Sequence, residues 1–471
     1  MSDRRPNIVF IMADDHAAHA VSAYGSKINH TPHIDRIAEE GMRLDNCFCT
    51  NSLCAPSRAS IMTGTYNHVN GVQTLSTEYD ARQPAIPRML QEDGYQTALI
   101  GKWHLGHGGV HDPRGFDHWS VVPDQGRYHN PVFLGMDGEQ RVIPGYCTDI
   151  ITDLSLDWLD RRDPDRPFFL MVHHKAPHRN WEPDAKHLSL FEDGDLPVPE
   201  TFFDDYGGRA TAAREARMRV ADDLRMDDLK RILPPGLTAD EQALWKYQTY
   251  IKDYLRCVQS VDDNVGRLLG YLDDRGLTED TIVVYTSDQG FFLGDHGWYD
   301  KRFMYEESLR MPFVVRYPRE IPAGGVNGDL VVNVDFAQTF LDYAGVAAHP
   351  RMQGRSFRPL LRGEAVGDWR TSAYYRYWEH DDGIHHVWAH YGVRTDRYKL
   401  IYYYADGLGI PGASDRVFAP EWELFDLAED PWELHCVHDD PAYAAVRAEL
   451  EAELARVQAE IGDEPHVRAG T

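Results

Sequence analysis

The sequence has little positive charge for its size. Its 471 residues include 48 Lys and Arg against 75 Asp and Glu, which gives a formal net charge of −27 at pH 7. Because a protein that binds duplex nucleic acid needs a basic surface, this balance argues against nucleic acid as a partner. A small anionic substrate stays compatible with it, since a pocket can be locally positive on an acidic protein.

Long hydrophobic runs are also missing. No segment approaches the roughly 20 apolar residues of a membrane-spanning helix, and the first apolar run, residues 8–12, is too short for the core of a secretory signal. Six cysteines in a chain of this length do not form a disulfide framework. We therefore expect a cytoplasmic protein without a membrane partner, and the sequence leaves a homo-oligomer open.

Short apolar runs alternate with helical patterns through the first three quarters of the chain. The runs predict strands, and the patterns between them predict helices. The predicted strands are residues 7–12, 42–49, 95–100, 168–172, 281–286 and 313–317, and the predicted helices are 34–40, 87–93 and 241–274. This alternation is typical of an α/β domain with a large, mostly parallel sheet flanked by helices.

One segment interrupts this alternation. Residues 184–237 are rich in Asp, Arg, Pro and Gly and poor in apolar residues. We interpret them as an insertion with a helical piece near 210–225. The insertion could be a lid or a subunit contact, and a solvated surface excursion explains its composition equally well.

The composition changes again near residue 368. Aromatic-rich strands are predicted first, and a polar amphipathic helix follows them: the strands are 374–378, 391–395 and 398–404, and the helix is 444–461. We therefore predict a catalytic α/β domain over residues 1–367. A C-terminal α+β subdomain, a smaller antiparallel sheet packed with one helix, is predicted over 368–471.

Reactive side chains follow four of the predicted strands. In open α/β sheets ligands bind at the carboxyl ends of the strands, so side chains at those ends are candidates for a single site. They are Asp14 and Asp15 after the first strand, Lys102 and His104 after 95–100, His178 after 168–172, and Asp288 and Gln289 after 281–286.

Three of these carboxylates and one amide suit a hard cation. Asp14 and Asp15 would repel each other without a cation, and Asp288 with Gln289 adds a carboxylate and an amide oxygen. Oxygen donors of this kind favour Ca²⁺ or Mg²⁺. Asp14 and Asp15 alone could equally form a helix cap or a turn, but the four residues together favour a metal site.

Two lysines and two histidines complete the candidate set. Lys102 and Lys301 are candidate clamps for an oxyanion, although most lysines are solvated on a protein surface. His104 and His178 are candidate acid–base groups, because imidazole titrates near neutrality. Many histidines in a chain with 23 of them are structural or exposed, and we assign five to that class: His173, His174, His385, His386 and His390.

Cys54 begins a helical run within the pentapeptide Cys54-Ala55-Pro56-Ser57-Arg58. A thiol at a helix N-terminus would have a lowered pKa, which is consistent with a thiol nucleophile that uses a histidine base. The pattern Cys-x-Pro-Ser-Arg also resembles the maturation signature of the sulfatases, in which the cysteine is oxidised to formylglycine. The carboxylates and lysines elsewhere in the chain favour the second interpretation.

Further motifs extend this resemblance to the type I sulfatases of the alkaline phosphatase superfamily. They lie at residues 7–15, 54–58 with Ser60, Thr63 and Gly64, 101–106, 176–178, 287–290, and 424–427 with Asp430 and Pro431. The segment 287–308 is similar to the branch that contains iduronate-2-sulfatase and bacterial glycan sulfatases. The resemblance implies an alkaline-phosphatase-like α/β fold.

The resemblance also implies an activity, the hydrolysis of a sulfate monoester on a sulfated sugar or an aryl or alkyl sulfate. The reaction would use a metal-bound formylglycine hydrate derived from Cys54. The implied ligands of the metal are Asp14, Asp15, Cys54, Asp288 and Gln289. The implied ion is Ca²⁺, and Mg²⁺ or Mn²⁺ is also possible. Many family members have Asn where this chain has Gln289, which leaves the ion preference open.

A role for each remaining residue follows from the same resemblance. Lys102 and Lys301 hold sulfate oxygens, His178 assists the leaving alcohol, His104 acts as the base that expels sulfate, and Arg58 orients the diol. A small sulfated molecule is the implied substrate, and a formylglycine-generating enzyme is a transient partner.

Three other functions remain open. The same site could prefer a phosphonate or phosphate ester, because a metal and lysines stabilise phosphoryl oxygens as well. The protein could be an inactive glycan-binding relative of the sulfatases. Cys54 could also act as a thiol, and a chelator would then leave activity intact.

Overall fold

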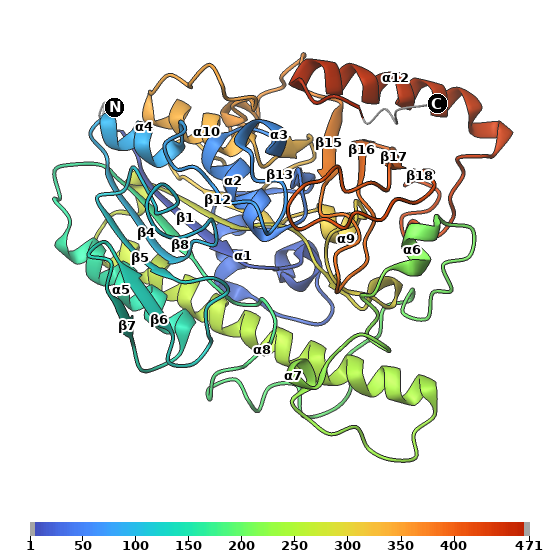
Figure 1. Cartoon of the computed structure of the whole chain (residues 1–471). Helices are drawn as coiled ribbons and strands as arrows, with labels where there is room; N and C mark the ends of the chain where they lie inside the picture. The colour runs from blue at the N-terminus through green and yellow to red at the C-terminus, as the bar shows by residue number, and fades with distance from the viewer. Residues whose placement is uncertain (1–4, 466–471) are drawn as a thin grey trace.

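A large mixed sheet forms the centre of the computed structural model, which describes residues 5–465 (Figure 1). Its ten strands have the order β13-β2-β12-β9-β1-β8-β4-β5-β6-β7. The five central strands are parallel: β9 (Thr281–Ser287), β1 (Asn7–Ala13), β8 (Phe168–His173), β4 (Gln96–Lys102) and β5 (His118–Val122). The predicted α/β fold with a mostly parallel sheet is confirmed.

The outer strands make the sheet mixed. On one side β12 is antiparallel to both β9 and β2, whereas β13 is parallel to β2. On the other side β6 is antiparallel to β5, and β7 is antiparallel to β6. These strands are β12 (Phe313–Arg316), β2 (Met42–Leu44), β13 (Gly325–Asn327), β6 (Val132–Gly135) and β7 (Gln140–Val142). The predicted strand 42–49 is wrong in extent: after β2 the chain leaves the sheet, and β3 (Cys47–Phe48) pairs with β14 (Val331–Val332) instead.

Helices cover both faces of the sheet, which explains why its central strands are continuous apolar runs. Along β1, Ile8, Phe10 and Met12 belong to one hydrophobic cluster, and Val9 and Ile11 to the other. One face is covered by α2 (Cys54–Thr63), α4 (Ile86–Glu92) and α10 (Asp335–Ala344), and the opposite face by α1 (Pro32–Glu39), α5 (Cys147–Arg161) and α8 (Ala239–Asp274) (Figure 1). The sheet is therefore buried between two helical layers.

The long helix α8 confirms the prediction for residues 241–274. It begins at a capping box in which the Thr238 hydroxyl accepts from the Glu241 amide and the Glu241 carboxylate accepts from the Thr238 amide. One face is buried against the sheet and the other is polar. Within residues 5–465, no helix combines the length and apolar character that crossing a bilayer needs.

A smaller antiparallel sheet forms the C-terminal part of the chain. It contains β15 (Ser372–Tyr377), β16 (His390–Thr395), β17 (Tyr398–Tyr403) and β18 (Glu421–Asp426), and α12 (Ala444–Ile461) packs on it. The first three strands and the helix were predicted. Strand β18 was not, because its glutamates obscure the apolar pattern; Glu423 is buried and accepts hydrogen bonds from Tyr305 and Tyr403. The division between residues 367 and 368 stays a prediction, and the two parts share one hydrophobic cluster.

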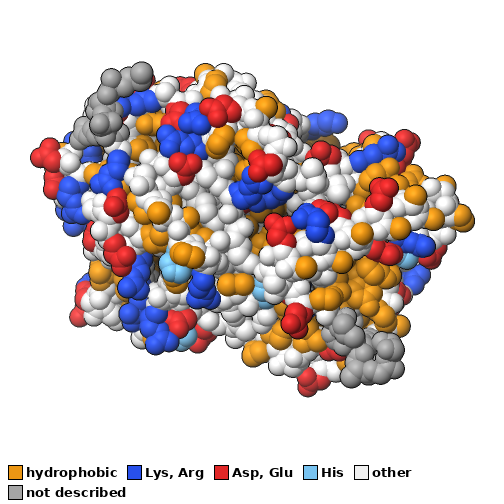
Figure 2. Space-filling view, turned by 90° about the horizontal axis from the view of Figure 1, so that it is seen from above, with side chains coloured by type: hydrophobic (Ala, Val, Ile, Leu, Met, Phe, Trp, Pro, Cys, Tyr) orange, Lys and Arg blue, Asp and Glu red, His pale blue; other side chains and the backbone are white. Residues whose placement is uncertain are grey.

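The segment 184–237 is mostly irregular. It contains α6 (Thr211–Glu215) and α7 (Met226–Leu229), so the predicted helix near 210–225 is wrong in its extent. The segment is not only a solvated excursion, because Asp228 is buried and binds Arg179 through two N–H···O contacts of 3.1 and 2.5 Å. On the face of the molecule shown in Figure 2, acidic and basic side chains are interspersed rather than gathered in one acidic field.

Candidate active site

The carboxyl ends of four neighbouring strands bring the predicted residues together. The strands β9, β1, β8 and β4 are adjacent and parallel, so the loops after them meet at one edge of the sheet. Ligand atoms of Asp14, Asp15 and Asp288 all lie within 4.8 Å of one another, and so do those of Asp14, Cys54 and His178. The prediction of a single site from residues far apart in the sequence is confirmed.

The backbone at the end of β1 directs the two adjacent carboxylates. The Asp14 amide donates to the Ala176 carbonyl at 3.2 Å, and the Asp15 amide donates to Asp288 Oδ1 at 3.2 Å. Asp15 has φ of 68°, in the left-handed region that Asp tolerates better than most residues. The chain therefore turns sharply at Asp15 and keeps both side chains in the site.

Burial and mutual repulsion perturb the three carboxyl groups. Burial would raise the pKa of Asp14, but the charges of Lys102 and Arg58 outweigh it and hold the pKa well below its usual range. Burial raises the pKa of Asp15 to about 6 despite the nearby Lys301. Burial and the charge of Asp14 raise the pKa of Asp288 to about 7. Three buried carboxyl groups in one place favour a cation between them.

Two unpaired oxygen atoms at this site also favour a bound cation. Asp14 Oδ1 and Gln289 Oε1 are buried and have no hydrogen-bond partner among the described residues. Buried polar atoms are normally paired, and both atoms are hard oxygen donors. The Gln289 amide nitrogen donates to Asp15 Oδ1 and lies 3.9 Å from Cys54 Sγ. The set of Asp14, Asp15, Asp288 and Gln289 therefore fits a divalent cation, and nothing in it selects Ca²⁺ over Mg²⁺ or Mn²⁺.

Helix α2 places Cys54 and Arg58 on the same face, because residues four apart lie one above the other on a helix. Arg58 Nε and Nη2 lie 3.0 and 2.9 Å from Asp288 Oδ2, and Nη1 donates to the Lys102 carbonyl at 3.0 Å. Its side chain is 1% exposed. Arg58 therefore joins the helix to the ends of β9 and β4, and its charge compensates Asp288.

The lysines are buried in the site, so neither is a solvated surface lysine. Lys102 Nζ donates to Asp14 Oδ2 and to Gln125 Oε1. Lys301 Nζ lies 2.5 and 2.7 Å from the two oxygens of Asp15 and 3.5 Å from Cys54 Sγ. Two ammonium groups thus flank the thiol and the carboxylates, which is the arrangement an oxyanion clamp needs.

Both candidate histidines reach the site as neutral rings. Burial lowers the pKa of His104 and of His178 well below the usual value. His178 Nδ1 lies 2.7 Å from the Arg179 carbonyl, so Nδ1 carries the proton and Nε2, 3.7 Å from Asp15 Oδ2, presents a lone pair. His104 Nε2 lies 3.2 Å from the Gln125 side-chain nitrogen and accepts from it.

Gln125 was missed by the sequence analysis. It lies on the loop after β5, a strand that was not predicted, and its side chain bridges Lys102 and His104. His385, which we assigned to the structural or exposed class, lines the same cavity as Cys54, with its Nε2 3.6 Å from Asp300 Oδ2. Neither residue belongs to a recognisable motif, and only the tertiary structure brings them here. His173 is structural, as expected, with Nδ1 3.1 Å from the Lys102 carbonyl.

The thiol of Cys54 is not activated. Burial and the negative charge of Asp14 raise its pKa well above the usual value, so the expectation of a lowered pKa at the helix N-terminus is wrong. Desolvation and the carboxylates outweigh the helix dipole here. A thiolate nucleophile is therefore disfavoured at this position.

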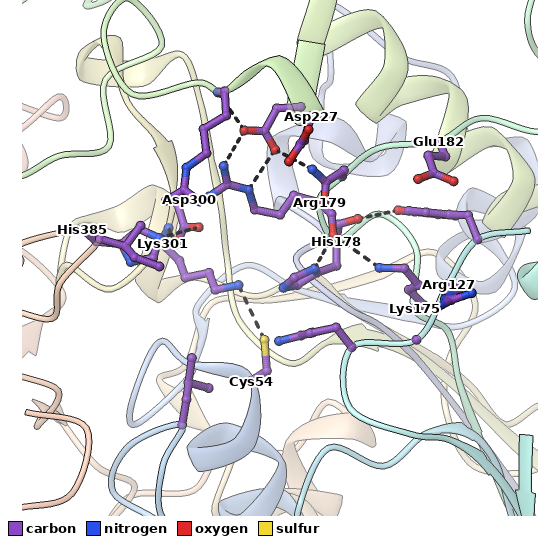
Figure 3. Close-up of a pocket in the computed structure, with 18 of the residues that line it drawn as sticks. Cys54, Arg127, Lys175, His178, Arg179, Glu182, Asp227, Asp300, Lys301 and His385 are labelled. Carbon is purple, nitrogen blue, oxygen red and sulfur yellow. Dashed lines mark hydrogen bonds and ion pairs between the residues drawn. The ribbon is translucent and has the colours of Figure 1, made fainter. Parts of the chain in front are cut away.

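A cavity of about 610 Å³ opens above these residues (Figure 3). Cys54, His178 and Lys301 lie at its inner end. Its walls come from the loop after β5, the loop after β8, the segment around Asp228 and the stretch 300–302. A small molecule can therefore reach the carboxylates and the thiol from solvent.

Comparison with known proteins decides the family. A family model described as sulfatase matches residues 6–346. The chain belongs to the sulfatase family. A second model, for the C-terminal part of N-sulphoglucosamine sulphohydrolase, matches residues 294–460 of this sulfatase.

Similar proteins match most of the length of this sulfatase. The N-acetylglucosamine-6-O-sulfatase of Bacteroides thetaiotaomicron is 43% identical over 98% of this chain and 87% of its own. The N-acetylglucosamine-6-sulfatase of Capra hircus is 30% identical over 79% of this chain and 66% of its own. A solved structure, of a protein in complex with its substrate D-glucosamine-2-N,6-O-disulfate, superposes with a TM-score of 0.92 at 43% identity, covering 98% of this chain and 99% of that one.

The comparisons confirm several predictions. The sulfatase family, the alkaline-phosphatase-like fold, the likeness to bacterial glycan sulfatases and the hydrolysis of sulfate esters all stand. Membership of the family implies formylglycine and a divalent metal in general. A phosphonate monoester hydrolase from Silicibacter pomeroyi superposes with a TM-score of 0.76 at 22% identity, covering 98% of this chain and 96% of that one, and this likeness is one of fold.

Proposed function

We propose that this sulfatase hydrolyses the 6-O-sulfate ester of N-substituted glucosamine. The observation that carries the proposal is the 43% identity and the TM-score of 0.92 over 98% of the chain. The coverage of 98% of this chain and 99% of that one supports a common substrate class, a sulfated sugar.

Two lysines near the carboxylates are placed to bind the sulfate group. Lys301 Nζ, 3.5 Å from Cys54 Sγ, is within reach of a sulfate group carried at that position. Lys102 lies on the other side of the carboxylates and contacts Asp14. We assign both ammonium groups to the sulfate oxygens, where they offset charge that develops in the transition state.

Asp14, Asp15, Asp288 and Gln289 would hold the divalent cation. When bound, such an ion supplies Lewis-acid chemistry at the reacting oxygen. We propose Ca²⁺ first, because every donor is an oxygen and Ca²⁺ accepts irregular oxygen sets, and Mg²⁺ or Mn²⁺ after it. Arg58 keeps Asp288 in place through its contacts of 3.0 and 2.9 Å.

Formylglycine at Cys54, formed by a formylglycine-generating enzyme, supplies two hydroxyl groups on one carbon when hydrated, and so both a nucleophile and a means to release sulfate. The cysteine at this position is buried and unactivated, in agreement with a residue that needs modification. Mass spectrometry of active protein should show a residue 54 that is about 18 Da lighter than cysteine, the mass difference that follows from loss of H₂S and gain of O.

The histidines have separate proposed roles. His104 stays neutral and its Nε2 lone pair accepts from the Gln125 amide, so this nitrogen takes a proton from a hydroxyl group when that hydroxyl replaces Gln125 as the donor. His178 Nε2 also presents a lone pair, because Nδ1 donates to the Arg179 carbonyl. To assist the leaving alcohol as an acid, His178 must therefore first gain a proton at Nε2, and otherwise it acts as a hydrogen-bond acceptor.

The test is sulfate release from a panel of monosaccharides. The metal-loaded, formylglycine-bearing enzyme should cleave N-acetylglucosamine-6-sulfate and glucosamine-2-N,6-O-disulfate at C6. Its kcat/KM should be lower for the 3-O-sulfate and for galactose-6-sulfate, and lower again for aryl sulfates and aryl phosphonates. A higher kcat/KM for phosphonates would contradict the proposal, and so would the lack of turnover on every sugar, which would indicate an inactive glycan-binding relative. The cytoplasmic location stays a prediction, to be checked by cell fractionation.

A further inference from the structure

Three of the six lysines and arginines that line the cavity, Arg179, Lys301 and Arg302, are paired with carboxylates. Arg179 makes two contacts with Asp228, of 3.1 and 2.5 Å. Arg302 donates to Glu379 at 3.0 Å and lies 3.5 Å from Asp382. These guanidinium groups stabilise the walls of the cavity, and their charge is largely compensated within the protein.

Arg127, Lys175 and Arg225 also line the cavity, and none of their side chains has a carboxylate partner in residues 5–465; Arg225 lies on the segment that carries Asp228, apart from the other two in the chain. The Arg127 side chain is exposed at the cavity, and no ion pair or side-chain hydrogen bond joins it to another residue in the part of the chain that the structure describes, 5–465. Lys175 is only 4% exposed, yet its ammonium has a single hydrogen bond, to the Arg179 carbonyl at 3.3 Å, and no carboxylate partner within those residues. A buried ammonium without a counter-charge is costly.

The two cations lie next to each other. Lys175 Nζ is 4.6 Å from the centroid of the ring of Tyr128, the residue that directly follows Arg127 in the chain. A Cβ atom added at Gly126 would lie 3.6 Å from Lys175 Cδ. The loop 125–128 therefore packs along the Lys175 side chain, and Figure 3 shows Arg127 beside Lys175.

The opposite side of the cavity carries charged groups that are paired with one another. Figure 3 shows Lys301 and His385 on the far side of Cys54 from Arg127 and Lys175. Asp300 accompanies them, and its neighbouring cations hold its carboxylate in the ionised form despite burial. Lys301 and Arg302 lie beside Asp300 and are paired with Asp15 and Glu379, so these two cations have carboxylate partners within the described residues. Glu182 also lines the cavity near Arg127, but it is exposed and forms no ion pair with either cation among the described residues.

The geometry points to a second anion-binding subsite, formed by Arg127 and Lys175, that holds the N-sulfate of a 2-N,6-O-disulfated glucosamine. This inference rests on the proposed function, because it takes the 6-O-sulfate to lie at Cys54. A sulfate on N2 supplies the charge that Lys175 lacks and accepts hydrogen bonds from both cations. An N-acetyl group in the same place leaves Lys175 uncompensated, so the enzyme discriminates in favour of the N-sulfated sugar.

The test compares two free monosaccharides that differ only at N2. For the metal-loaded enzyme, kcat/KM is measured on glucosamine-2-N,6-O-disulfate and on N-acetylglucosamine-6-sulfate, and their ratio is the readout. We expect a ratio of about 10 to 100 for the unaltered enzyme, the worth of one or two charge-assisted hydrogen bonds. Arg127→Ala and Lys175→Met should each bring the ratio down about tenfold, towards one.

Two control variants separate this effect from misfolding. Lys175→Arg keeps the positive charge and should retain most of the ratio, even if packing against Tyr128 lowers both rates. Arg161→Ala removes an exposed arginine on α5 that lines no part of the cavity, and should leave the ratio unchanged. Thermal melting of Lys175→Met reports whether that variant folds, and Arg127→Ala, at an exposed position, tests the inference independently.

Each outcome has one meaning. If the unaltered enzyme cleaves neither sugar, the proposed function fails before the subsite is tested. If it cleaves both and the ratio is near one in every variant, the proposed function stands and the subsite does not exist. A third substrate, a disaccharide with a uronate next to N-acetylglucosamine-6-sulfate, tests whether the subsite binds a carboxylate instead of an N-sulfate. If Arg127→Ala impairs that disaccharide more than the disulfated monosaccharide, the subsite binds the carboxylate and the N-sulfate assignment is overturned.

Discussion

Replacement of Gln289 by leucine should remove most of the stabilisation that a divalent cation confers. Gln289 Oε1 is buried beside Asp14 and Asp15 without a hydrogen-bond partner in the described chain, which supports the proposal that it is a cation ligand. A ligand that binds only the folded protein adds about 2.7 kcal/mol to the free energy of unfolding when its concentration is a hundred times Kd. That increment sets the expected size of the effect.

The increment converts into a melting-temperature shift through the entropy of unfolding. At about 2.1 cal/mol/K per residue, a chain of 471 residues has an unfolding entropy of about 1 kcal/mol/K. Saturating Ca²⁺ should therefore raise Tm by about 3 °C after treatment with a chelator. If loss of the amide oxygen weakens binding about tenfold to a hundredfold, the same Ca²⁺ concentration raises Tm by only about 0.4 to 1.4 °C.

Differential scanning calorimetry of chelated protein, with Ca²⁺, Mg²⁺ and Mn²⁺ titrated separately, measures the shift and ranks the ions. Gln338→Leu is the matched control, because Gln338 is also buried and its Oε1 also lacks a partner among the described residues, but it lies on α10 away from the carboxylates. Gln338→Leu should keep the full shift. A full shift in Gln289→Leu, or no shift with any of the three ions in the unaltered protein, would refute the reasoning.

Three further predictions concern single residues. Lys301→Met should lower kcat about 10²- to 10³-fold, because a preorganised donor to the sulfate is lost. The control variant Lys252→Met should keep the kcat of the unaltered enzyme. If both variants have the same kcat, Lys301 does not bind the sulfate. Gln125→Leu should move the acid limb of the kcat/KM pH profile to higher pH, because the Gln125 amide donates to His104 Nε2 and so stabilises the neutral ring. If the acid limb does not move, Gln125 does not control the pKa of the catalytic base. Burial lowers the pKa of His390 to about 4, so the unfolded chain binds more protons between pH 6.5 and 4, and stability falls by about 3 kcal/mol as the pH drops through that range. Urea unfolding of His390→Phe should show a smaller loss over the same range, and exposed His435→Phe an unchanged one.

The sequence predicted four of the five central strands and missed β5, because a strand covered on both faces is recognised when it is apolar along its whole length. Residues 7–12 and 281–286 are such runs, and the structure places them side by side as β1 and β9. Strand β18 and the loop after β5 escaped prediction for the opposite reason. Their polar residues form hydrogen bonds with partners distant in the chain, such as Glu423 with Tyr305 and Gln125 with Lys102. A local sequence pattern does not show which distant residues these partners are.

The pKa of Cys54 shows the same limit for electrostatics. From local structure, the helix N-terminus predicts a lowered pKa. In the folded chain, burial and the charge of Asp14, which is distant in the sequence, reverse the sign. Long-range charges and desolvation decide the protonation of a buried group, and neither can be read from its neighbours along the chain.

By itself, the sequence determined four of the five central strands, the family and the candidate residues for sulfate chemistry, because each of these rests on local patterns: apolar runs, short motifs and polar residues that end strands. Only the tertiary structure decided which groups surround the substrate. Arg127, Lys175, Asp300 and His385 come from separate loops and share a cavity solely because the sheet order and the packed insertion bring those loops together. Chemistry at the sulfate depends on short turns at strand ends, whereas recognition of the sugar depends on distances through space that no stretch of sequence contains.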